Sequence, residues 1–178
     1  MSDLDAVHAD HLHCERKAAQ SALSLIRSYP ERADLVREMA RLAHDETRHV
    51  IQVSALMNRR GQPAAYDFGD DYAVALRDHI RKREPERLLE RLLVFAVIEG
   101  RSAERLALLA GALQATPAAD PRDGQLYESL AAAELRHRDT FLALARDAAP
   151  ATWQARAAEL AVIEANVLAR RPVIPRIH

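Results

Sequence analysis

Apolar residues recur at spacings of three and four along most of this chain, which is the pattern of amphipathic helices packed on a core. Tyr29-Pro30 interrupts the pattern, and Gly61, Pro63 and Pro85 mark later breaks, because glycine favours helix ends and proline stops a helix. Between residues 62 and 85 the periodicity weakens, which predicts a loop and one short helix. The expected helices are 4–28, 31–58, 70–83, 86–114, 124–147 and 151–169, followed by an extended tail at 170–178.

Composition narrows the class of protein. The 178 residues suffice for one domain with a full core, and no linker interrupts them, so we expect a single domain over residues 1–178. Apolar residues make up 49% of the chain, aromatic residues only 4%, and there are 5 glycines. These values favour closely packed helices over a turn-rich β fold. The net charge of −1 provides no global attraction to nucleic acid.

The single cysteine and the short apolar runs exclude several kinds of site. Cys14 alone cannot form an internal disulfide, an iron–sulfur cluster or a cysteine-type zinc site. The chain opens without an apolar signal region, and its longest apolar run, residues 92–98, is too short to span a bilayer. We therefore expect a cytoplasmic protein that does not enter a membrane.

Two segments, residues 42–49 and 130–137, read almost alike and each contain Glu-x-x-His. Residues three apart share one face of a helix, so Glu46 with His49, and Glu134 with His137, each present a carboxylate and an imidazole together. Two such helices, with one Glu from each of two others, make the two-metal site of ferritin-like bundles. The sequence thus predicts an all-α, ferritin-like four-helix bundle with one long crossover and an extra C-terminal helix.

The two remaining carboxylates must come from the first and third long helices. Glu15 lies on the apolar stripe of the first helix. On the third, Glu99 follows the apolar residues 94–98, where a carboxylate is too costly to keep without a partner or a metal. Glu104 lies about 140° around that helix, beside two arginines, and can be solvated. We therefore choose Glu99 over Glu104 as the carboxylate ligand from the third long helix.

The apolar stripe of the first helix, which carries Glu15, is made of His8, Leu12, Glu15, Ala18, Ala19, Ala22 and Ile26.

The predicted set holds four carboxylates and two imidazoles, which suit iron or manganese better than zinc or copper. Asp45 shares a face with His49, but its counterpart in the second segment is Ala133, so Asp45 is expected to be solvated or outside the ligand set. His11 lies one turn before Glu15 and could support it. The other histidines are expected at the surface. They are His8, His13, His44 and His79. The predicted metal ligands are Glu15, Glu46, His49, Glu99, Glu134 and His137.

The amino-acid sequence around these ligands resembles that of the tRNA hydroxylases of the MiaE type, which are non-haem di-iron monooxygenases. The resemblance rests on residues 14–20, Cys-Glu-Arg-Lys-Ala-Ala-Gln, on residues 98–105, Ile-Glu-Gly-Arg-Ser-Ala-Glu-Arg, and on the two Glu-x-Arg-His segments. It implies hydroxylation of the isopentenyl group of 2-methylthio-N6-isopentenyladenosine in tRNA, with two iron ions (Fe2+/Fe3+) as cofactor and O2 as co-substrate. The sequence has no flavin or dinucleotide motif, so an external electron donor, a ferredoxin or a reductase, is expected. The resemblance fits a monomer or small homo-oligomer.

A tRNA partner requires positive charge near the site. The candidate tRNA contacts are Arg59, Arg60, Arg81, Lys82 and Arg83. Glu84, Glu86 and Glu90 are interleaved with the last of these, so a mixed-charge solvated face is an equal alternative. Two other functions use a similar ligand set. One is a ferritin- or bacterioferritin-like ferroxidase, and the other is a di-iron oxidase that acts on a small molecule.

Overall fold

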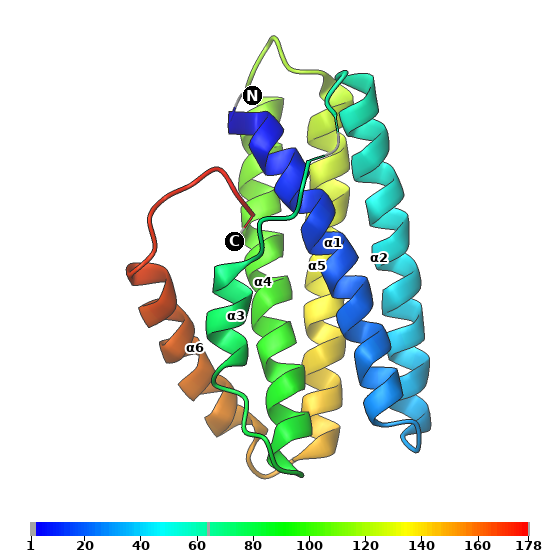
Figure 1. The fold of residues 1–178 in the computed structure, drawn as a ribbon, viewed down its shortest axis with the longest axis vertical. Coiled ribbons are helices and arrows are strands. Elements are labelled where there is room, and N and C mark those ends of the chain that lie inside the picture. Colours follow the sequence, from blue (N-terminus) through cyan, green and yellow to red (C-terminus); the bar gives the residue numbers. More distant parts are fainter. Residues whose placement is uncertain (1–2, 64, 178) are drawn as a thin grey trace. The chain divides into compact units, whose positions relative to one another are not determined.

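The structure, a computed structural model, describes residues 3–63 and 65–177, and in these residues it contains helices and no strand (Figure 1). The predicted helices are all present. Those preceding the connection between the hairpins are α1 (Asp3–Ser28) and α2 (Ala33–Arg59), and α3 (Asp71–Arg77) lies on that connection. They are followed by α4 (Glu86–Gln114), α5 (Pro121–Ala148) and α6 (Trp153–Ala169). After α6 the tail is not helical up to residue 177, and His178 lies outside the described residues.

The predicted bounds agree within a few residues except at the short helix, which ends at Arg77 rather than at 83. After Arg77 the chain makes tighter turns, with His79 N–H donating to Leu76 O and Ile80 N–H to Arg77 O. The next N–H, that of Arg81, donates to the side chain of Glu90 at 2.6 Å. A carboxylate on α4 therefore takes a donor that a longer helix would have used in its own ladder.

Within the described residues the chain forms two compact units. The first unit runs up to Phe68 and includes Ile174–Ile177, and in it α1 packs against α2. The second unit is Gly69–Val173, in which α4 packs against α5, and α3 and α6 lie against α4 (Figure 1). The single domain expected from the sequence stays a prediction.

Each unit has its own buried apolar side chains. In the first unit the fully buried residues include Leu25, Met39 and Leu56, with Ala19 and Ala22 keeping α1 close to α2. In the second unit they include Leu92 and Leu106, and the rings of Phe95 and Phe141 meet at a centroid distance of 5.5 Å. None of the described helices combines the length and the apolar character needed to cross a bilayer.

Helix α2 ends just before Gly61, the glycine that the sequence analysis expects near the end of this helix. Gly61 has φ +65°, the left-handed conformation that glycine adopts without strain. The N–H of Gly61 then donates to Asn58 O, and the N–H of Gln62 donates to Met57 O at 2.9 Å, which satisfies the last carbonyls of the helix. This reversal returns the chain to α1, where Gln62 Nε2 donates to Asp5 O at 2.6 Å.

Candidate metal centre

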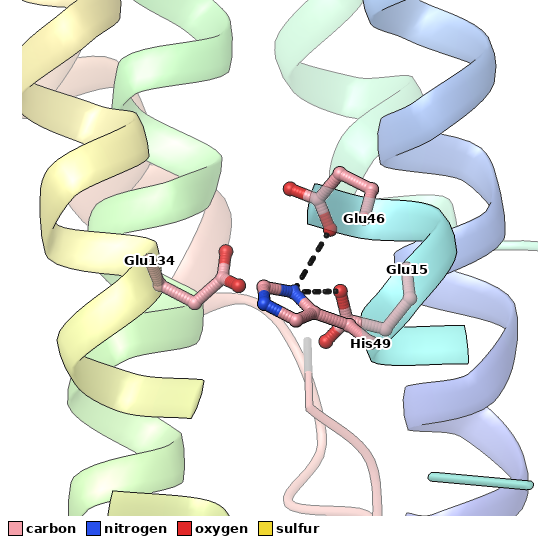
Figure 2. Close-up of side chains that lie close together, drawn as sticks. All are labelled: Glu15, Glu46, His49 and Glu134. Atoms are coloured by element: carbon pink, nitrogen blue, oxygen red, sulfur yellow. Dashed lines mark hydrogen bonds and ion pairs between the residues drawn. The ribbon is translucent and has the colours of Figure 1, made fainter. Parts of the chain in front are cut away.

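Glu15, Glu46 and His49 form a buried cluster in the first unit, called here the first half-site. Glu15 comes from α1, and the other two face it from consecutive turns of α2. The Nδ1 atom of His49 lies 3.2 Å from Glu15 Oε2 and 3.4 Å from Glu46 Oε2 (Figure 2). The exposed fractions of the three residues are 4%, 0% and 7%. The spacing of three residues in α2 thus delivers a carboxylate and an imidazole to one point, as the sequence predicts.

Glu15 is held as a carboxylate by its neighbours. Burial is the largest influence on its pKa and acts to raise it. The charge of His11 and the hydrogen bonds that Glu15 forms with Glu46, His11 and His49 act in the opposite direction, and together they hold the pKa well below its usual range. His11 is 1% exposed, and its Nε2 is hydrogen-bonded to Glu15 Oε1. The side chain is therefore charged at neutral pH and suited to bind a cation.

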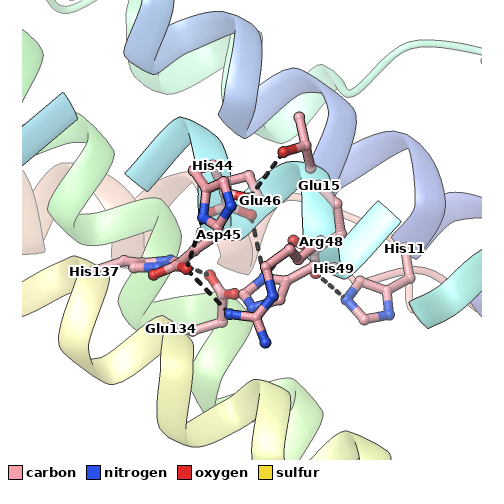
Figure 3. Close-up of polar contacts among 10 residues, drawn as sticks. His11, Glu15, His44, Asp45, Glu46, Arg48, His49, Glu134 and His137 are labelled. Carbon is pink, nitrogen blue, oxygen red and sulfur yellow. Dashed lines mark hydrogen bonds and ion pairs between the residues drawn. The ribbon is translucent and has the colours of Figure 1, made fainter. Parts of the chain in front are cut away.

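Glu99, Glu134 and His137 form the second half-site, in the second unit. Glu99 projects from α4, and Glu134 and His137 from adjacent turns of α5. Nδ1 of His137 lies 3.8 Å from Glu134 Oε2 (Figure 3). The three residues are 5%, 2% and 5% exposed. Glu104, the rejected alternative on α4, is 58% exposed at its side chain and pairs with Arg101. The burial of Glu99 supports its choice over Glu104.

The donor sets of both half-sites suit a metal ion. In each, one donor atom from every residue lies within 4.8 Å of a donor atom from the other two. Carboxylates in such dry surroundings are costly unless a positive charge compensates them. Oxygen donors combined with one imidazole are typical of sites for hard to intermediate divalent cations. Each buried cluster could therefore hold a metal ion.

The histidines and Asp45 test the predictions made around the ligands. His44 and His79 are exposed, as predicted. Asp45 is also solvated: its side chain is 43% exposed, and its Oδ1 lies 3.5 Å from Arg48 (Figure 3). The surface position of His8 is wrong, because His8 is 0% exposed and lies 3.1 Å from Gln62 Oε1. His13 is half-buried, because its Nε2 is 2.8 Å from Ala65 O.

His11 contacts Glu15, which is the role that its position one turn before Glu15 allowed. A signal for this was present in the sequence, since His8, His11 and Glu15 recur at helical spacing on one face of α1. Helical spacing alone does not tell which histidines on that face are buried and which are exposed. The loop after α2, which contacts His8 and His13, covers them through contacts distant in sequence.

His11→Ala is expected to lower the affinity for iron about 10- to 100-fold, because partners that orient a ligand carboxylate have effects of that size. The measurement is a titration of the metal-free protein with Fe2+ under anaerobic conditions, with helix content followed by circular dichroism. His44→Ala is the matched control, since the His44 side chain is 73% exposed on α2. Equal affinities of the two variants would show that His11 has no influence on the site.

The five candidate tRNA contacts are all on the surface, but they are not equivalent. Arg59, Arg60, Lys82 and Arg83 are exposed. Arg81 is half-exposed and its Nε donates to Glu90 Oε1 at 2.5 Å, so much of its charge is already compensated. Glu90, which belongs to the alternative of a mixed-charge solvated face, is 0% exposed, so that alternative does not hold for this residue. The assignment of these residues to tRNA stays a prediction, and among them Arg81 is the weakest candidate.

Comparison with known proteins identifies relatives over the whole chain. The family model described as tRNA-(MS[2]IO[6]A)-hydroxylase (MiaE) matches residues 1–178. The chain is 39% identical over 170 residues to the tRNA 2-(methylsulfanyl)-N(6)-isopentenyladenosine(37) hydroxylase of Pseudomonas putida, covering 92% of this chain and 80% of that protein. It is 28% identical over 213 aligned positions to the enzyme of the same name from Salmonella typhimurium, covering 93% of this chain and 77% of that one.

A solved structure shows the same fold. Protein 43 with aldehyde deformylating oxygenase activity, from Synechococcus, superimposes with a TM-score of 0.88 at 35% sequence identity, over 99% of this chain and 89% of that one. The all-α, ferritin-like fold predicted from the sequence is therefore confirmed. The family predicted from the text around the ligands is confirmed as well, because the match is continuous from the first to the last residue and 39% identity extends over nearly all of the chain. The chain belongs to the MiaE family of tRNA hydroxylases.

Proposed function

We propose that this protein is an O2-dependent hydroxylase of the isopentenyl group of 2-methylthio-N6-isopentenyladenosine in tRNA. The observation that supports it most is the pair of half-sites: two buried Glu-x-x-His pairs, each with a second buried carboxylate, in a chain of this family. The relatives from Pseudomonas putida and Salmonella typhimurium carry the name of that activity.

We infer that the six ligands together hold two iron ions. Each half-site contributes two carboxylates and one imidazole, which is a similar set for each metal. Four carboxylates carry a charge that two divalent ions neutralise, so a buried and otherwise costly cluster becomes balanced. The near repeat of residues 42–49 in residues 130–137 supports a site built from two matching halves. When bound, the iron pair supplies the activation of O2.

The residues of the chain would orient and protect this chemistry. His11 holds the Glu15 carboxylate in one direction through its hydrogen bond, and burial of both half-sites excludes water from the ligands. In the overall reaction one oxygen atom enters a C–H bond and the other leaves as water. This balance needs two electrons and two protons from outside. The chain has one cysteine and no flavin motif, so we propose a separate ferredoxin or reductase as donor.

A small-molecule oxygenase is the second candidate. The structural similarity to the Synechococcus protein favours it, because the activity printed for that protein is aldehyde deformylation. One fold can host several unrelated activities, so this fold also suits a free aldehyde or another small substrate. The substrate, rather than the metal chemistry, separates the two candidates.

Analysis of tRNA nucleosides tests the proposed function. In cells that make the isopentenyl nucleoside, deletion of this gene is expected to remove its hydroxylated form and leave the unhydroxylated precursor. A plasmid with the wild-type gene should restore the product, and one with His49→Ala should not, because that variant loses the imidazole of the first half-site. Mass spectrometry of digested tRNA measures both nucleosides. An unchanged nucleoside pattern after deletion, together with turnover of free aldehydes by the purified protein, would favour the second candidate.

A further inference from the structure

The segment that follows α2 is fastened along α1 within the first unit. Gln62 contacts α1 at Asp5 and His8. Further along, Ala65 O lies 2.8 Å from His13 Nε2. The Asp67 carboxylate then accepts from Arg16 at 2.5 Å and lies 2.9 Å from Lys17 Nζ. These contacts follow successive turns of α1, so the described residues 62–63 and 65–68 have a defined path.

Two aromatic side chains of this segment face solvent. Tyr66 is 88% exposed and Phe68 is 81% exposed. They flank Asp67, whose side chain turns towards α1, and neighbouring side chains of a non-helical segment tend to alternate in direction. The chain has 3 Phe and 4 Tyr, and all of them except these two are buried. Tyr66 and Phe68 therefore differ from the other Phe and Tyr residues of the chain in exposing their rings to solvent.

The rings lie among apolar side chains, including Ala6, Ala9 and Ile174, with charged groups nearby. A hollow of about 370 Å³ adjoins them, and its lining includes Asp10, His13, Tyr66, Phe68, Pro175 and Arg176. Arg16 and Lys17 share the single carboxylate of Asp67. Arg176 faces Asp10 at 4.0 Å. Three cations against two carboxylates leave one positive charge beside the rings.

We propose that Tyr66 and Phe68 are a stacking platform for unpaired bases of the tRNA substrate, an inference that rests on the proposed function. Unpaired bases of RNA loops are recognised mainly by stacking on aromatic side chains, and cations nearby attract the phosphates. The core of an interface with a protein partner is instead depleted of charged residues. Here the Asp67 carboxylate turns away from the rings towards α1, and the charged groups of Arg16, Lys17 and Arg176 lie nearby. This arrangement suits flat, separate bases joined by a charged backbone.

The test compares two double variants in their affinity for RNA. Tyr66→Ala with Phe68→Ala removes both rings, and Tyr66→Phe with Phe68→Tyr keeps them. Affinity is measured by fluorescence anisotropy on a labelled anticodon stem-loop and on a fully paired duplex made from the same stem. Loss of each stacked base should weaken stem-loop binding by about 5- to 150-fold, while the ring-retaining variant binds normally. Duplex binding should not change. Ile51→Ala, which alters a 68% exposed apolar residue on α2, is the matched control.

The salt dependence separates stacking from charge. Removing uncharged rings should lower the affinity at every salt concentration without changing the slope of log affinity against log salt, which reports on phosphate contacts. If wild type hydroxylates tRNA and the alanine variant binds the stem-loop equally well, the platform is wrong and the proposed function stands. Normal RNA binding with a loss of reductase-supported turnover would assign the rings to a protein partner and overturn the proposal. If wild type neither binds nor hydroxylates tRNA, the proposed function itself fails.

Discussion

Glu99→Ala is expected to abolish hydroxylation and to reduce the iron content, whereas Glu104→Ala should leave both nearly unchanged. Glu99 is 5% exposed on α4 and its carboxylate belongs to the second half-site. Without it, three carboxylates face two divalent ions and one ion loses an oxygen ligand. Because even the loss of a partner outside the ligand set costs up to about 100-fold, the loss of a ligand should exceed that.

Glu104 is the matched control because it lies on the same helix and carries the same group. Its exposed pair with Arg101 should contribute at most about 1 kcal/mol. Glu99→Gln keeps the volume of the side chain and removes its charge, so it separates loss of the ligand from loss of packing. Iron content by metal analysis and turnover on isolated tRNA measure the result. If Glu104→Ala proved the more damaging change, the assignment on α4 would be wrong.

Glu90→Ala is expected to lower the free energy of unfolding by about 3–5 kcal/mol, the range found when one member of a buried ion pair is removed. Glu90 is 0% exposed on α4 and joins three parts of the second unit. Its carboxylate accepts from the backbone and side chain of Arg81, and it lies 2.9 Å from Nε of Arg156 on α6. The Arg156 side chain is only 17% exposed. The substitution therefore leaves the Arg156 guanidinium with little water and only the exposed carboxylate of Glu159 as an ionic partner.

Glu159→Ala provides the comparison for Glu90. Glu159 pairs with the same Arg156 at 2.7 Å, but its side chain is 63% exposed. Removing it should cost no more than about 1 kcal/mol. Urea denaturation followed by circular dichroism measures both variants. Equal losses of stability would mean that burial of Glu90 adds nothing to the pair.

The residues that the sequence could predict are those set by local spacing. Glu46 and His49 follow from the geometry of one helical turn, and the bounds of α4 follow from Pro85 before it and the loop with Pro117 after it. Glu99 could be separated from Glu104 because their angle around the helix puts them on different faces. In each case the answer depends on a few neighbouring residues.

The features that were missed depend on contacts distant along the chain. Glu90 resembles Glu84 and Glu86 in sequence, neither of which is buried, and only the approach of α6 with Arg156 makes it a buried acceptor. The end of α3 depends on the same carboxylate, which takes the N–H of Arg81. His8 is covered because Gln62 returns to α1 after the Gly61 turn. The helical periodicity of the sequence does not reveal such contacts between distant residues.

The return of Ile174–Ile177 to the first unit makes the second unit an insertion. The chain leaves the first unit after Phe68 and rejoins it at Ile174, where Ile177 is 2% exposed and its N–H donates to Asp10 Oδ2 at 2.8 Å. Two peptide crossings therefore connect the ligand-bearing halves. Because the backbone is one linear chain, a cut after Phe68 would leave residues 3–68 bound to Ile174–Ile177 only through non-covalent contacts such as the Ile177–Asp10 hydrogen bond. The C-terminal tail thus ties the end of the chain to α1, and the contacts that bury Ile177 are the ones that would oppose separation after such a cut.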